Sequence, residues 1–207
     1  MTPLPGDCVL FSRAMLLRAI SSKNSCQSGQ KALPPRVSKA FPQEALPERL
    51  SGLPPAITAN CTLLILGSFP SAASLAERQY YAHPQNRFWP IVATCLGLDF
   101  TKMSYRARIA AVNAAGIGIW DVYASCERAG SLDSAIRHPE FNDFARARRK
   151  APSLARVCCN GATAGKALRH LQALGFETVV LPSTSPANAS QSFDYKLAQW
   201  RAALGAP

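Results

Sequence analysis

The chain has 207 residues, 48% of them hydrophobic, and its 23 Lys and Arg against 12 Asp and Glu give a net charge of +11. This length is enough for one domain with a substantial core. No apolar run approaches the roughly 18 residues that a membrane-spanning helix needs, so no membrane partner is expected. The positive charge favours an anionic partner such as nucleic acid, and a basic surface that serves only solubility is the alternative.

Residues 1–58 differ from the rest of the chain. They hold half of the sixteen prolines and, apart from one short basic apolar segment, show no helical or strand periodicity. We expect a poorly ordered, basic, proline-rich N-terminal extension over 1–58, followed by a folded domain over 59–207. A transit peptide, or a natural start nearer Met15, fits the basic segment equally well.

Apolar runs and amphipathic segments alternate after residue 60. Continuous apolar runs such as TLLILGS predict strands that are buried on both faces, and segments such as SYRARIAAVNAAG predict helices. Asn142 is expected to cap one helix, and Pro152 to end it. The alternation predicts an α/β fold whose parallel sheet has helices on both faces. In chain order we expect strand 62–68, helices 88–97 and 104–116, strand 117–122, helix 142–152, strand 155–161, helix 162–175, strand 178–183 and helix 193–204.

The unusual side-chain chemistry follows the predicted strands. Parallel strands end at one edge of a sheet, and ligands bind beyond that edge. The first strand is followed by a loop much longer than the usual two to six residues, and this loop ends in YYAHPQNRFW. We therefore expect a functional site at the segments 67–70, 120–121, 160–161 and 182–183.

Several chemistries have no support in the sequence. There is no G-x-G-x-x-G, no G-x-x-x-x-G-K-[ST] and no G-x-S-x-G, so neither a nucleotide cofactor nor a serine nucleophile is indicated. The strand ends are polar but barely ionisable, which favours positioning a water molecule and hydrogen-bonding a neutral ring. A thiol hydrolase that pairs Cys126 or Cys159 with His83 is the alternative.

The seven cysteines are odd in number and include no C-x-x-C pair. This pattern argues against a disulfide framework, a zinc site and an iron–sulfur cluster. Buried free thiols in a reducing cytoplasm are the simplest interpretation. We expect a cytoplasmic protein with no metal, iron–sulfur cluster or other cofactor.

Five blocks in this order, GSFPSAAS…YYAHPQNRFW, WDVYASCERAGSLDSAI, NDF, NG and LPSTSPANA, resemble the hypoxanthine-DNA glycosylase branch of the uracil-DNA glycosylase superfamily. The resemblance covers about residues 61–200. It implies a three-layer α/β/α fold around a central four-stranded parallel sheet. It also implies a monofunctional DNA glycosylase of base excision repair that flips out a deaminated base and hydrolyses its N-glycosidic bond without a metal. Hypoxanthine, uracil and xanthine are the candidate bases.

The resemblance also implies roles for individual residues. In mismatch-specific relatives the first motif holds the attacking water with an asparagine, but Phe69 stands there in this chain. The water-holding role therefore falls to Asn86, with a helix cap as its alternative role. Asn160 would bond a base edge or assist the leaving group, unless it is only a turn residue before Gly161.

The same blocks imply a set of base-pocket residues and a set of DNA-binding residues, which are named below. Three of these residues have structural alternatives: His83 could brace its loop, Tyr81 could pack within the loop, and Asp121 could be a turn residue. The alternatives for the whole chain are a mismatch-type uracil-DNA glycosylase and an inactive nucleic-acid-binding relative. We expect a monomer whose partner is DNA that contains deaminated bases. The expected substrate-base pocket comprises Gly67, Ser68, Phe69, Pro70, Ser71, Tyr81, Phe88 and Asp121. The expected DNA-binding residues are His83, Ser183, Ser185, Pro186, Ala187 and Asn188.

Overall fold

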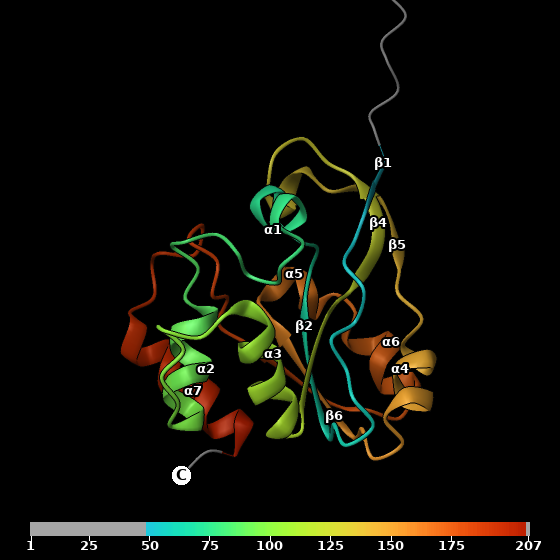
Figure 1. Cartoon of the computed structure of the whole chain (residues 1–207). Helices are drawn as coiled ribbons and strands as arrows, with labels where there is room; N and C mark the ends of the chain where they lie inside the picture. Colours follow the sequence, from blue (N-terminus) through green and yellow to red (C-terminus); the bar gives the residue numbers. More distant parts are fainter. Residues whose placement is uncertain (1–48, 206–207) are drawn as a thin grey trace, which may run out of the picture. The chain divides into compact units, whose positions relative to one another are not determined.

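The computed structural model of the chain describes residues 49–205 (Figure 1). A four-stranded parallel sheet with the strand order β3-β2-β6-β7 lies at the centre of this part. Its strands are β2 (Leu63–Gly67), β3 (Ile117–Asp121), β6 (Arg156–Asn160) and β7 (Glu177–Leu181). The predicted α/β fold with a four-stranded parallel sheet is thereby confirmed, and each of the four expected strands is present.

Helices cover both faces of this sheet. In Figure 1, α2 (Phe88–Leu96), α3 (Tyr105–Ala114) and α7 (Phe193–Leu204) lie to the left of β2, and α4 (Phe144–Lys150) and α6 (Leu168–Ala173) lie to its right. The short helix α5 (Ala162–Gly165) follows β6, and α1 (Ala72–Glu77) follows β2. The structure therefore has the three layers that the sequence predicts.

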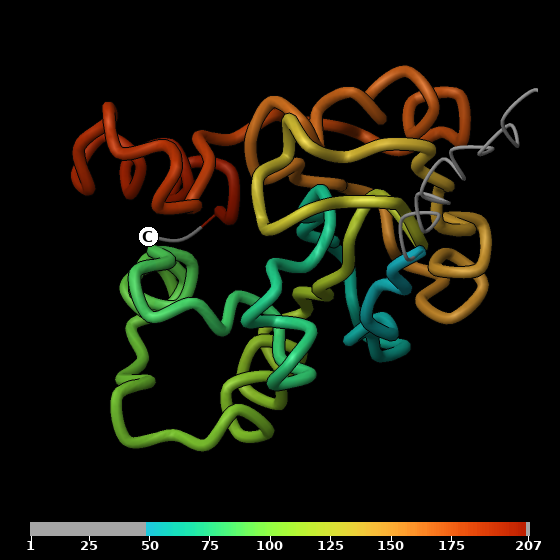
Figure 2. The backbone as a smooth tube through the Cα atoms, turned by 90° about the horizontal axis from the view of Figure 1, so that it is seen from above, coloured from blue at the N-terminus to red at the C-terminus, as the bar shows by residue number. Residues whose placement is uncertain are grey.

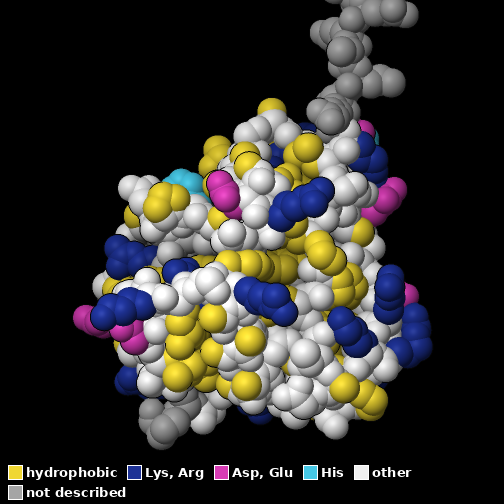
Figure 3. Space-filling view, viewed as in Figure 1, with side chains coloured by type: hydrophobic (Ala, Val, Ile, Leu, Met, Phe, Trp, Pro, Cys, Tyr) yellow, Lys and Arg dark blue, Asp and Glu magenta, His cyan; other side chains and the backbone are white. Residues whose placement is uncertain are grey.

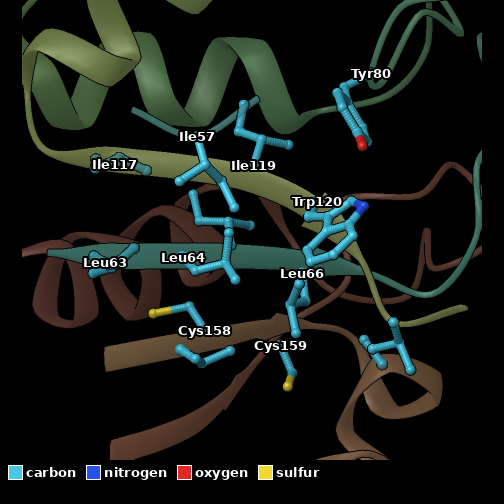
Figure 4. Packing of buried hydrophobic residues seen from close by; sticks show 14 of the residues in the cluster. Ile57, Leu63, Leu64, Leu66, Tyr80, Ile117, Ile119, Trp120, Cys158 and Cys159 are labelled. Carbon is cyan, nitrogen blue, oxygen red and sulfur yellow. The ribbon is translucent and has the colours of Figure 1, made fainter. Parts of the chain in front are cut away.

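The core forms around the two central strands because all five residues of both β2 and β3 are buried. Ile57 packs over Leu64 and Ile119 in the layer between the sheet and the helices (Figure 4). The same layer contains Gly118, where a Cβ atom would lie 3.0 Å from Ile57. Continuous burial on both faces explains why these strands appear in the sequence as unbroken apolar runs.

Local signals set most helix boundaries. Ser104 and Ser192 cap α3 and α7 by accepting hydrogen bonds from the backbone N–H groups of Ala107 and Tyr195. The expected cap of α4 was wrong by one residue, because the Asp143 side chain accepts from the N–H of Arg146. The single helix expected over 162–175 is interrupted, and it forms the two helices α5 and α6.

A second sheet was not expected from the sequence. Its three antiparallel strands, in the order β1-β4-β5, are β1 (Arg49–Ser51), β4 (Tyr123–Glu127) and β5 (Arg137–Phe141), and the 3-10 helix η1 (Asp133–Ala135) precedes β5. Residues 49–58 lie inside the segment that was expected to be an extension, but they form β1 and place Ile57 in the core. Residues 1–48 of that segment lie outside the described residues.

No helix in residues 49–205 combines the length and the apolar character that crossing a membrane would require.

Candidate active site

A cavity of about 850 Å³ lies beyond the carboxyl ends of the four parallel strands. This volume falls within the range of about 300–1,000 Å³ that is usual for small-molecule sites. Figure 2 looks down on this end of the molecule, where α1 (teal) and the loop between β4 and β5 (yellow) lie side by side. The cavity brings together every expected site residue except Phe88: Gly67, Ser68, Phe69, Pro70, Ser71, Tyr81, His83, Asn86, Asp121, Asn160, Ser183, Ser185, Pro186, Ala187 and Asn188.

The turn after β2 forms one wall of the cavity and is held by contacts to the β4–β5 segment. The Ser68 hydroxyl donates to the Asp133 carboxylate at 2.7 Å. The guanidinium of the buried Arg128 donates to the carbonyl of Pro70 and lies 5.0 Å from the centre of the Phe69 ring. These contacts fix the ring of Phe69 at the cavity wall.

The long loop between α1 and α2 forms a second wall. Tyr81 has a left-handed backbone (φ 55°), a conformation that costs energy for a residue other than glycine. His83 Nδ1 accepts from the N–H of Gln85 at 3.2 Å, so the imidazole braces the loop. The Oδ1 of Asn86 accepts from the N–H of Phe88 at 2.9 Å, at the start of α2. Asn86 therefore lines the cavity and also holds the first N–H group of α2, the contact expected of a cap, from the position before the N-cap residue Arg87.

Phe88 lies behind this wall. Its side chain is fully buried in the core, and its ring stacks on that of Tyr81 with 3.7 Å between the ring centres. It does not line the cavity. Phe69, which does line it, is therefore the better candidate for a ring that stacks on a ligand.

The loop after β7 closes the cavity and is tied to the end of β6. Asn160 donates through Nδ2 to the Thr184 hydroxyl at 2.8 Å and accepts through Oδ1 from the Thr184 N–H at 2.9 Å. The Ser183 and Ser185 hydroxyls accept from backbone N–H groups within the same loop. The loop backbone reaches the opposite wall, because the carbonyl of Thr184 accepts from the N–H of Arg87 at 3.0 Å. The amide of Asn160 thus positions the loop.

Asp121 ends β3 and is the ionisable group at the floor of the cavity. Its side chain is buried and its Oδ2 atom has no hydrogen-bond partner among the described residues. Burial raises the pKa of Asp121 to about 8, and the charge of nearby Asp133 acts in the same direction, while Arg128 opposes it. Burial likewise raises the pKa of Tyr81, and the charge of Asp121 adds to this effect, while a hydrogen bond with the side chain of Asn160 opposes it. With its pKa raised in this way, the carboxyl of Asp121 is mainly protonated at neutral pH.

The loop between β4 and β5 also lines the cavity, although the sequence suggested no role for its residues. Ser131, Leu132 and Asp133 form part of the wall. Leu132 is 59% exposed, whereas its neighbours are tied to the turn after β2 by the bonds Ser131–Ala72 and Ser68–Asp133. The only signal in the sequence was the block SLDSAI, which carried no chemistry of its own.

The two cysteines considered as nucleophiles, Cys126 and Cys159, do not form a reactive site. Cys126 and Cys159 are fully buried, and neither lines the cavity. Burial raises the pKa of both thiols, that of Cys159 to about 11, so little thiolate exists at neutral pH. This arrangement does not support a thiol hydrolase. Among residues 49–205, no cluster of three or more His, Cys, Asp and Glu is arranged to hold a metal ion.

Basic side chains are spread over the surface and do not form one patch on the face shown in Figure 3. Some of those on α4 serve the fold. Arg148 donates to the carbonyls of Leu174 and Gly175 and stacks over the ring of Phe176 at 4.1 Å. Arg149 pairs with Asp143 at 3.1 Å. The basic run on this helix is thus partly structural.

The fold and the cavity define an α/β protein whose ligand site lies at the carboxyl edge of a parallel sheet. Residues 54–204 match the profile of the uracil DNA glycosylase superfamily. The chain belongs to this superfamily.

Comparison with individual proteins agrees with this assignment. The chain is 40% identical over 137 residues to a protein of Methanosarcina acetivorans named hypoxanthine DNA glycosylase. The aligned segment covers 66% of this chain and 87% of that protein. The chain is 39% identical, with the same coverage, to a protein of that name from Methanosarcina barkeri. A solution NMR structure of a candidate uracil DNA glycosylase from M. acetivorans superposes with a TM-score of 0.69 at 37% identity, over 76% of this chain and 97% of that one.

Proposed function

We propose that this protein is a monofunctional DNA glycosylase that flips a deaminated base, hypoxanthine first among the candidates, into the cavity and hydrolyses its N-glycosidic bond in base excision repair. The observation that carries the proposal is the convergence of the family motifs on one cavity in a chain about 40% identical to proteins named hypoxanthine DNA glycosylase. The enzyme would act on DNA as a monomer, in the cytoplasm and without a cofactor.

Extrusion of the base is required because its glycosidic bond is out of reach inside a duplex, and it costs a few kcal/mol. The cavity is large enough for a purine. Stacking of the extruded ring on Phe69 would return roughly 1–3 kcal/mol of this cost. The guanidinium of Arg128 packs over the ring of Phe69 and holds it in place, so the ring is positioned before the base enters.

Hydrolysis needs a water molecule held near the sugar carbon. Asn86 is suited to this task, because a carbonyl oxygen has two lone pairs and only one of them is used by the N–H of Phe88. The second lone pair can accept from a water molecule in the cavity. Departure of the base leaves negative charge on its ring, and the backbone N–H groups of the 68–71 turn are candidates to stabilise it.

DNA would approach across the mouth of the cavity. The loop after β7, with Ser183, Ser185, Pro186, Ala187 and Asn188, lies on one side of the mouth. The exposed Leu132 lines the cavity from the loop between β4 and β5. An apolar side chain in this position can enter the base stack and hold it open while the base is out.

The proposal is tested with oligonucleotides that carry one deoxyinosine, deoxyuridine or deoxyxanthosine, followed by alkaline cleavage of the abasic product. Release of hypoxanthine faster than uracil is the expected result. A preference for uracil opposite guanine would favour the mismatch-type alternative. DNA binding without release of any of the three bases would identify an inactive relative and would overturn the proposal.

A further inference from the structure

The cavity wall includes side chains that belong to none of the five sequence blocks and have no role in the proposed chemistry. One of them lies on β7, and the others lie on or just before helix α7, which is red in Figure 1. Tyr195 and Gln199 are one helical turn apart, so they share one face of α7, and the cavity extends along this face. The four residues are Val180, Gln191, Tyr195 and Gln199.

Exposed apolar side chains concentrate at this cavity. Five large hydrophobic side chains among residues 49–205 are exposed, and three of them, Leu132, Val180 and Tyr195, line the cavity. Single exposed apolar residues are common, but a group of them at one place marks an interaction site. Tyr195 is 49% exposed. It combines an apolar ring with a polar tip, which suits a ligand whose surface is partly apolar and partly hydrated.

The opposite face of α7 fixes the position of Tyr195. Lys196 and Trp200 are buried, and they donate hydrogen bonds to the two ends of the loop after β7. The Lys196 ammonium donates to the carbonyl of Asn188 at 2.6 Å, and the Trp200 indole N–H donates to the carbonyl of Pro182 at 3.0 Å. The ring of Tyr195 is therefore held beside the loop that is proposed to contact DNA before any DNA binds.

Two positive charges lie beside the same loop. Burial lowers the pKa of the Lys196 ammonium, and the nearby charge of Arg87 lowers it further. Arg87 packs over the ring of Phe193 at 5.7 Å, and its backbone N–H donates to the carbonyl of Thr184. Neither cation forms a salt bridge within the described residues, and Asp194, in the first turn of α7, pairs with neither. A pair of cations that no carboxylate offsets attracts the phosphate backbone of DNA.

We propose that Tyr195 forms a second nucleotide subsite, in which its ring stacks on the base next to the lesion in an unpaired strand. This inference rests on the proposed function. The cavity of about 850 Å³ lies near the upper end of the range for drug-sized ligands, and one nucleobase is smaller than such a ligand. Phe69, on the turn after β2, is assigned to the extruded base, so the ring on α7 is left for a neighbour.

This subsite favours single-stranded DNA. In a duplex the neighbouring base stays paired inside the helix, and its one open face borders the gap that Leu132 is proposed to fill. In a single strand the neighbouring base is free, and an aromatic ring can stack on any base because each has a π face. Stacking of this kind strengthens binding by about 5- to 150-fold.

The test combines changes in the protein with changes in the substrate. Single-stranded oligonucleotides carry one deoxyinosine, and a tetrahydrofuran residue replaces the nucleotide before it, the nucleotide after it, or neither. Single-turnover hypoxanthine release at increasing enzyme concentration gives the half-saturating concentration and the maximal rate. Loss of one of the two flanking bases should raise the wild-type half-saturating concentration about ten-fold or more, and loss of the other should have little effect.

Tyr195→Ala should show the same increase on the intact oligonucleotide and should not respond further when that flanking base is removed. Its effect should fall on the half-saturating concentration rather than on the maximal rate, and the increase should be several-fold smaller on a duplex. Tyr195→Phe keeps the ring and should recover most of the lost affinity. Phe141→Ala is the matched control, because Phe141 is also 49% exposed but does not line the cavity.

A Tyr195→Ala variant that responds to the flanking base as strongly as the wild type overturns this inference, and so does a wild type that responds to neither flanking base. Equal weakening of Tyr195→Ala on single strands and duplexes also overturns it, because the ring would then contact something other than a free neighbouring base. A wild type that releases no deaminated base overturns the proposed function. Fluorescence anisotropy with the same oligonucleotides then gives the same comparison as dissociation constants and decides this inference separately.

Discussion

Replacement of Asn86 by alanine separates the two roles that the structure allows for this residue. Its Oδ1 atom accepts from the N–H of Phe88 at 2.9 Å, so the substitution removes a capping contact. Loss of such a cap costs about 1 kcal/mol of unfolding free energy, which lowers Tm by about 2–4 °C in a protein of this size. If the same amide also holds the attacking water, base release should fall by about 10²–10³-fold in addition.

The assay combines thermal unfolding with single-turnover base release on the same preparations. Asn86→Ser is the matched control, because its hydroxyl can still accept from the N–H of Phe88, although more weakly than an amide. It should recover part of the lost stability and none of the lost rate. Asn86→Asp keeps the capping contact and should keep part of the activity, because a carboxylate can also orient water. DNA affinity should be nearly unchanged in all three variants, since it depends mainly on phosphate contacts.

The catalytic role of Asn86 would be refuted by an alanine variant that loses stability but releases base within a few-fold of the wild type. Recovery of both stability and rate in Asn86→Ser would have the same meaning, because the cap alone would then account for the defect.

Three further predictions follow from single contacts. The wild type should lose about 1.4 kcal/mol of unfolding free energy per pH unit between about pH 5 and 7, because folded Asp121 keeps its proton up to about pH 8 whereas the unfolded chain releases it near 3.8. Asp121→Asn should not show this loss. Urea unfolding at both pH values measures the difference, and parallel curves for the two proteins would contradict the raised pKa of Asp121. Leu132→Ala should slow release from duplex DNA but not from single strands, with Leu98→Ala, an exposed leucine away from the cavity, as the control; equal slowing on both substrates would exclude a role in the stack. Asn160→Ala should cost about 1–3 kcal/mol, because it leaves the buried Thr184 N–H unpaired, and unchanged urea unfolding would show that the loop is held by other contacts.

The parallel sheet and the long helices could be predicted because they depend on local patterns. Strand β2 and helix α7 carry an unbroken apolar run and a serine cap, and both lie close to their expected bounds. Strand β5 could not be predicted, since all five of its residues are exposed and it includes Pro139. It forms through antiparallel pairing with β4 across the 128–136 loop, a contact that no local period encodes.

The site shows the same division. The sheet topology places Gly67, Asp121 and Asn160 at one edge, which the sequence alone predicts. Which of two nearby phenylalanines faces the cavity depends on the rotation of α2, and this rotation buries Phe88 in the core. Its neighbour in the motif, Asn86, lines the cavity from a loop whose backbone is left-handed at Tyr81, a conformation that the sequence does not signal.

Hydrogen bonds within the protein distinguish the side chains that hold the walls of this cavity in place from those that are left to contact a ligand. Asn160 and Ser183 have partners inside the protein, and these contacts fix the directions in which their remaining donors point. The Oδ2 atom of Asp121 has no partner among the described residues, so a ligand group that pairs with it gains a hydrogen bond without breaking one. A base that lacks a matching group would leave this atom unpaired and would still bear the cost of leaving the stack. Discrimination among extruded bases should therefore arise at the floor of the cavity, while the surrounding loops determine that extrusion occurs.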